Sequence, residues 1–94
     1  MSLPIREIDR AQRPRERLLS HGAEALSDAE LVAILLGSGR AGESAVAVAH
    51  GLLRAHGGVT GLSRAFPEEL AGAPGVGPAK AARLSAVPSL QCRR

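Results

Sequence analysis

Apolar residues recur along this chain with the spacing of helices, and glycine or proline interrupts them at short intervals. Leu31, Ile34 and Leu35, for example, fall on one face of a helix. No segment is a convincing strand. The pattern predicts helices over about 13–22, 28–36, 43–56, 67–72 and 78–87, with a short helical turn over 59–65.

The expected helix ends carry their own signals. Ser27-Asp28-Ala29-Glu30 is a capping box, in which Ser27 caps the helix and Glu30 reaches back from its third position. Pro67 begins the next helix, with two acidic residues in its first turn, and Pro88 is expected to end the last one. We therefore predict an all-α fold of five to six short helices.

Composition limits the size of the core. The chain has 94 residues, of which 45% are hydrophobic, with one Phe and no Trp or Tyr. A thin core of small side chains is expected, and Phe66, the single ring, is expected to fill part of it. The chain divides into an irregular basic arm (1–12), one helical domain (13–87), and a disordered tail or truncated linker (88–94).

The sequence offers no catalytic, metal or cofactor set. Cys92 is the one cysteine and lies near the end of the chain, so a reducing, cytoplasmic setting is the simplest interpretation. The histidines, His21, His50 and His56, are scattered along the chain. The capping box accounts for Asp28 and Glu30, which could otherwise suggest a catalytic pair of carboxylates. No stretch is long enough to span a membrane. We expect no enzyme activity, no metal, no cofactor and no membrane partner.

Charge is distributed unevenly along the chain. The net charge is +3, but residues 18–71 carry −3 while residues 72–94 carry +4 with no acid. Such a basic end is typical of a phosphate-binding face. A small net charge with solvated terminal arginines is an equally good interpretation of the charge alone.

The segment 69–84 holds the strongest functional signal. Gly75-Val76-Gly77-Pro78 reads as a tight glycine hairpin between two helices, which brings backbone N–H groups to a helix N-terminus. The candidate phosphate-binding residues are Gly75, Val76, Gly77, Ala79, Lys80 and Arg83. The alternative is a structural connector in which Val76 plugs the core.

A weak internal repeat precedes this segment by about forty residues. Gly37-Ser38-Gly39 also lies between two predicted helices, and Arg40 follows it. Two such hairpins can pack as a pseudo-symmetric pair, each facing one strand of a duplex. Gly37, Ser38, Gly39 and Arg40 are therefore a second candidate phosphate site. A plain structural linker is the stronger interpretation here, because the loop is longer and Glu43 would repel a phosphate.

Several stretches resemble the N-terminal domain of the bacterial RadC family. They are Arg13-Pro-Arg-Glu-Arg-Leu-Leu19, Leu26-Ser-Asp-Ala-Glu-Leu31 and Gly75-Val-Gly-Pro-Ala-Lys-Ala81. The resemblance covers about 13–86 and implies a helix-hairpin-helix domain that binds DNA without reading bases. In that family a JAMM-type, metallopeptidase-like domain follows, and this chain holds no His-x-His segment with which to bind its zinc.

The favoured function is thus sequence-independent binding of duplex or branched DNA by an accessory module of a DNA repair-associated protein. The alternative is a protein-interaction or scaffold domain that docks beside the metallopeptidase-like domain. On the first interpretation, Lys80→Glu should weaken DNA binding with little change in melting temperature.

Overall fold

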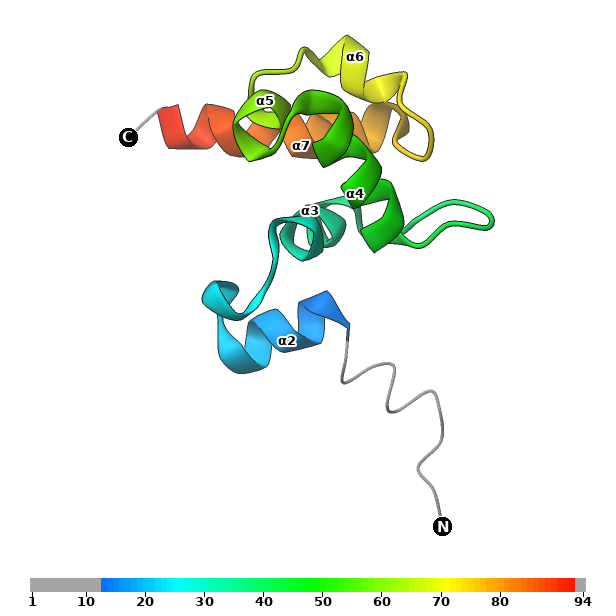
Figure 1. The fold of residues 1–94 in the computed structure, drawn as a ribbon. Helices are drawn as coiled ribbons and strands as arrows, with labels where there is room; N and C mark the ends of the chain where they lie inside the picture. The colour runs from blue at the N-terminus through cyan, green and yellow to red at the C-terminus, as the bar shows by residue number, and fades with distance from the viewer. Residues whose placement is uncertain (1–12, 93–94) are drawn as a thin grey trace.

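A computed structural model describes residues 13–92 as six α-helices and one short 3-10 helix joined by tight turns (Figure 1). The elements are α2 (Pro14–His21), η1 (Ala23–Ala25), α3 (Asp28–Leu36), α4 (Ala45–His56), α5 (Val59–Ser63), α6 (Pro67–Ala71) and α7 (Gly77–Cys92). Within this described range the backbone forms no β-strand, so the predicted all-α class is confirmed. The expected basic arm, 1–12, lies outside the described residues.

Side-chain caps set the start of the two central helices. Ser27 Oγ accepts a hydrogen bond from the backbone N–H of Glu30 (3.2 Å), and Glu30 Oε1 accepts one from the N–H of Ser27 (2.9 Å). This is the predicted capping box, and α3 begins where expected. α4 begins later than residue 43 because Ser44 is its cap and accepts from the N–H of Ala47 (3.1 Å).

The core lies where α3, α4 and α7 meet, and α5 and α6 each add one leucine to it. In the described part of the chain every buried side chain is apolar. The core cluster is Ala29, Val32, Ala33, Leu36, Val48, Ala49, Leu52, Leu62, Leu70, Val76, Ala81 and Leu84. The core contains only Ala, Val and Leu, in keeping with the small side chains that the composition predicted.

The buried face of α3 is not the one that carries Leu31, Ile34 and Leu35. Its buried residues are Ala29, Val32, Ala33 and Leu36. Leu31, Ile34 and Leu35 are only half-buried. The buried face combines two alanines with Val32 and Leu36, and it packs in the core with residues of α4.

Phe66 does not fill the core, and that prediction is wrong. Its side chain is 69% exposed, whereas Leu70, one turn further on, is only 1% exposed. Phe66 precedes Pro67 and takes the extended backbone that such a residue favours, with φ −73° and ψ 146°. It therefore occupies the N-cap position of α6, outside the packed turns of that helix.

The last helix does not end at Pro88 as predicted. α7 runs from Gly77 to Cys92 with Pro88 in its interior. Proline removes one backbone N–H donor, but its fixed φ near −65° is compatible with a helix. The residues 88–92 of the expected tail are thus helical.

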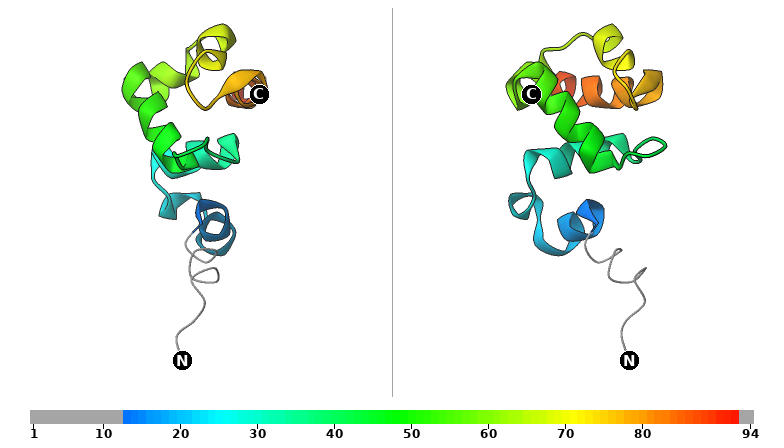
Figure 2. Two further views of the ribbon diagram at one scale, coloured as in Figure 1. Left: turned by 90° about the vertical axis from the view of Figure 1, so that its right-hand side faces the viewer. Right: turned by 45° about the vertical axis from the view of Figure 1, so that its right-hand side comes forward.

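α2 is held to the rest of the domain mainly by polar contacts. It contains no buried residue. The guanidinium of Arg17 forms an ion pair with Glu30 of α3 and donates a hydrogen bond to the backbone oxygen of Ala25 (2.8 Å). Figure 2 shows α2 at one end of the molecule, next to α3 and away from α6 and α7. None of the described helices is long and apolar enough to cross a membrane.

Candidate nucleic-acid interface

Two helix–helix turns lie on the same side of the molecule. The first hairpin is the loop Gly37–Ser44 between α3 and α4, and the second hairpin is the loop Gly72–Val76 between α6 and α7. Both project to the same side in Figures 1 and 2, although about forty residues of sequence separate them. The two candidate phosphate sites therefore belong to one face.

The second hairpin is a tight turn that buries one side chain. The N–H of Val76 donates to the backbone oxygen of Ala73 (3.1 Å), and the Val76 side chain is 6% exposed. Gly75 has φ +84°, and a Cβ there would lie 3.1 Å from Val48 Cγ2. Glycine is favoured at this position because the backbone angle strains any other residue and because a Cβ would crowd Val48.

The residue before α7 is Val76, whose side chain has no hydrogen-bond acceptor and so cannot cap the helix. The first N–H groups of a helix find no acceptor within the helix itself. In the described part of the chain, no hydrogen bond occupies the N–H of Gly77 or of Ala79, whereas that of Val76 is used in the turn. The second hairpin thus presents two backbone donors at the positive end of a sixteen-residue helix.

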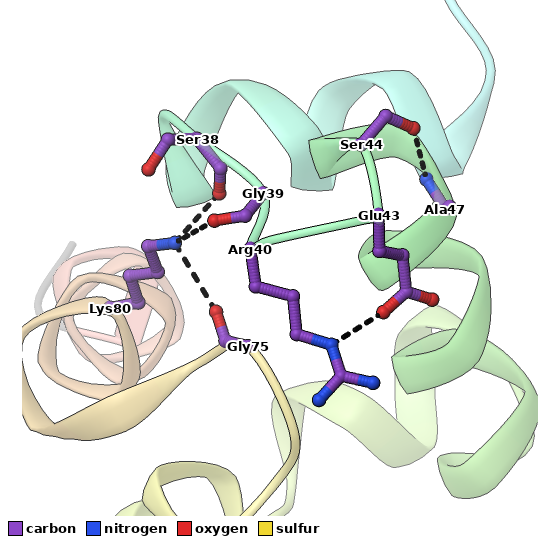
Figure 3. A network of polar contacts seen from close by, with 8 residues as sticks. All are labelled: Ser38, Gly39, Arg40, Glu43, Ser44, Ala47, Gly75 and Lys80. Atoms are coloured by element: carbon purple, nitrogen blue, oxygen red, sulfur yellow. Dashed lines mark hydrogen bonds and ion pairs between the residues drawn. The ribbon is translucent and has the colours of Figure 1, made fainter.

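Lys80 joins the two hairpins. Its Nζ donates to the backbone oxygens of Ser38 (2.7 Å), Gly39 (3.2 Å) and Gly75 (3.2 Å), as Figure 3 shows. An ammonium group has three protons, so these three bonds use its full donor capacity. Lys80 therefore fixes the two turns against each other while its positive charge stays at their junction.

Arg83 caps the end of α3. Its Nη2 donates to the backbone oxygen of Leu36 (3.0 Å). This is one of the last carbonyls of α3, which receive no hydrogen bond from an N–H of the same helix. A cation at a helix C-terminus also interacts favourably with the helix dipole. Lys80 and Arg83, the two cations predicted for the second hairpin, thus bind backbone oxygens at the end of α3 and in the first hairpin.

The first hairpin is closed by its own hydrogen bonds. Arg40 and Glu43 exchange two backbone bonds of 2.9 Å each, and Arg40 Nε donates to Glu43 Oε1 (2.8 Å; Figure 3). The stem of Arg40 lies beside the second hairpin, since a Cβ at Gly75 would be 3.2 Å from its Cδ. Glu43, which was expected to repel phosphate, is paired with Arg40 instead.

The structure therefore gathers all ten candidate residues at the junction of the hairpins and assigns several of them internal partners. The bridging role of Lys80 was not predicted, because its partners Ser38 and Gly39 are more than forty residues away and are backbone oxygens. The role of Arg17 in anchoring α2 was not predicted either. Within the described residues no three His, Cys, Asp or Glu side chains gather into a possible metal site.

These features define a small all-helical domain with two interlocked αα-hairpins and a basic, donor-bearing junction. The family model for the UPF0758 N-terminal region matches residues 5–82, so the chain belongs to this family. It is the RadC-related family that the sequence resemblance indicated.

Relatives with the same family name are close in sequence. The chain is 53% identical to a UPF0758 protein of Bordetella pertussis over 93 residues, 99% of this chain and 41% of that protein. It is 51% identical to a UPF0758 protein of Halorhodospira halophila over 84 residues, 89% of this chain and 38% of the relative. The chain thus spans about two fifths of the length of these relatives. No solved structure matches it significantly.

Proposed function

We propose that this domain is a helix-hairpin-helix module that binds the DNA backbone, without sequence readout and without catalysis. The observation that carries the proposal is the uncapped start of α7, where the N–H groups of Gly77 and Ala79 lie beside the glycine turn. A phosphate oxygen is a strong acceptor for such donors, and the helix dipole favours its negative charge.

Nearby cations support the same function. Lys80 holds its charge at the junction, Arg83 is exposed one turn further along α7, and Arg40 flanks the second hairpin. Lys80 acts here mainly through its positive charge, since its three donors already bind backbone oxygens. Arg83 uses Nη2 to bind the backbone oxygen of Leu36 and has further N–H donors on an exposed side chain. Contacts of this kind position a DNA backbone and do not specify bases. We expect non-specific affinity on the order of micromolar or weaker at physiological salt.

The test uses two substitutions on one face of α7. Ala79 and Ala86 are both exposed, and seven residues of helix place them on one face about 10 Å apart. Ala79→Glu puts a carboxylate at the predicted phosphate, and Ala86→Glu makes the same charge change two turns away. An acid in the first helical turn is also favourable for the helix, so Ala79→Glu should keep the fold.

Binding is measured by fluorescence anisotropy with labelled single-stranded, duplex and branched DNA at several salt concentrations. We expect saturable, salt-sensitive binding to duplex or branched DNA, a loss of about tenfold or more in Ala79→Glu, and a clearly smaller loss in Ala86→Glu. Equal losses in the two variants would show a general charge effect and reject the hairpin as the site. Absence of wild-type binding at low salt would reject the function.

A scaffold domain is the second candidate function. Leu90 is 66% exposed and Val87 is 37% exposed on the later turns of α7, and such apolar residues suit a protein contact. On this proposal the partner is the metallopeptidase-like domain implied by the family resemblance. Protection of α7 from hydrogen exchange when that domain is added, without any DNA binding, would favour the scaffold.

A further inference from the structure

A groove of about 570 Å³ lies between the start of α2 and the first hairpin. Arg13 and Arg15 line it on the α2 side, and Gly37–Gly39 line it on the hairpin side. Part of the remaining surface is apolar and includes Ile34 and Val46. The volume is in the range of small-ligand sites, large enough for a nucleotide-sized group.

The charges on this groove are of one sign. Among the described residues, its lining includes two arginines and no acidic residue. Both arginine side chains are exposed, and Arg15 Nε lies 3.5 Å from Glu16 Oε1, a surface pair of small energy. Arg17, on the same helix, is instead bound to Glu30 and to Ala25. Arg17 thus anchors α2, whereas Arg13, just before the helix, and Arg15 line the groove with exposed side chains.

The groove adjoins the hairpin junction, because both include residues of the first hairpin. The first hairpin forms one side of it, and the backbone oxygens of Ser38 and Gly39 in that hairpin bind Lys80 at the junction. A DNA strand that meets the start of α7 therefore has a path past the first hairpin toward α2. Guanidinium groups suit phosphate along such a path, and apolar surface suits the sugar.

We infer that this groove is a second DNA subsite, in which Arg13 and Arg15 contact phosphates of the strand that passes the first hairpin. The inference rests on the proposed function, and it assigns α2 a role in binding as well as in packing. Its occupant is a phosphodiester backbone, so the affinity gained there is independent of sequence and sensitive to salt.

The experiment compares two double variants that lose the same charge. Arg13→Gln/Arg15→Gln removes the two cations of the groove. Arg54→Gln/Arg64→Gln removes two exposed arginines that do not line it. Duplex binding is titrated by anisotropy at four salt concentrations, and circular dichroism verifies that each variant is folded.

We expect the groove variant to raise Kd about tenfold and to reduce the slope of log K against log salt by about 2, near 0.9 for each phosphate that the protein no longer neutralises. The control variant should change that slope by less than half as much. Equal changes in both variants, or no change in either, would overturn the inference. If Ala79→Glu still abolishes binding in that case, the proposed function stands without the groove. If the wild-type chain binds no DNA, both fail.

Discussion

The two hairpins share a Gly-x-Gly sequence but handle their backbone groups in opposite ways. In the first hairpin Ser44 caps the next helix, and the loop oxygens accept bonds from Lys80. In the second hairpin no side chain caps the next helix, and the N–H groups of Gly77 and Ala79 stay available within the described structure. The groups of the first hairpin thus have partners within the domain, and the second hairpin is the one that we propose binds phosphate.

This difference between the hairpins means that a repeated motif does not imply a repeated site. The first hairpin presents carbonyls toward the second, and α7 of the second supplies the cations that bind them. The similar sequences therefore do not give the two hairpins the same hydrogen-bond partners.

The largest effect is expected from a methyl group in the first hairpin. A Cβ at Gly39 would lie 2.1 Å from the backbone oxygen of Glu43, so Gly39→Ala must displace the backbone. We expect a loss of about 3 kcal/mol or more, at the upper end for overpacking. Gly75→Ala should lose about 1–2 kcal/mol, mainly because φ is +84° there.

Urea denaturation followed by circular dichroism measures both changes. Gly51→Ala is the matched control, because this glycine is exposed in α4 and a Cβ there meets nothing within 4 Å. That control should gain about 0.5–1 kcal/mol. If Gly75→Ala proves more damaging than Gly39→Ala, the account of the close approach in the first hairpin is wrong.

A smaller effect is expected from breaking the bridge between the hairpins. Lys80→Met keeps the stem and removes three hydrogen bonds to backbone oxygens. We expect a loss of about 2 kcal/mol, since bonds from a charged donor are worth more than neutral ones. Lys80→Glu should also lower stability, contrary to the expectation from sequence, because a carboxylate would face the same three oxygens.

Thermal unfolding tests the bridge, with the exposed Arg54→Met as a control for loss of one cation. A loss of about 2 kcal/mol corresponds to roughly 8–16 °C in Tm for a domain of this size. A Tm equal to that of the control would mean that Lys80 does not hold the hairpins together. The hydrogen-exchange rates of the first hairpin should rise in Lys80→Met.

The smallest effect concerns acid and the start of α3. Hydrogen bonds from the Ser27 backbone and side chain, with the charge of Arg17, hold the pKa of Glu30 below its usual range. A carboxyl whose pKa is lowered by folding stabilises the folded state at pH values above the ordinary pKa of glutamate, about 4.3. That contribution falls as the pH drops from there through the lowered pKa.

Chemical denaturation between about pH 6 and pH 2.5 measures this dependence. Glu30→Gln is the control, because glutamine retains the reach of the capping box without the charge. The wild-type chain should lose more stability over this interval than the variant. If stability falls with pH in the same way in both proteins, ionisation of Glu30 is not the source of the loss of stability in acid.

Local signals in the sequence were enough for most helix ends. The capping box at Ser27, the glycine after Leu36 and the proline at the start of α6 each act through neighbouring backbone groups, so their effect is visible in a short window. Pro88 was misleading for the same reason. Its local preference indicated an end, and the helix continues to Cys92.

The sequence by itself determined the all-α class, the positions of the two glycine turns and the excess of positive charge after residue 72. Only the tertiary structure decided which face of α3 is buried, where Phe66 lies and which groups Lys80 and Arg83 bind. The physical reason is range. Caps and turns depend on residues a few positions apart, whereas the bridge between the hairpins joins a side chain to backbone oxygens that carry no sequence identity.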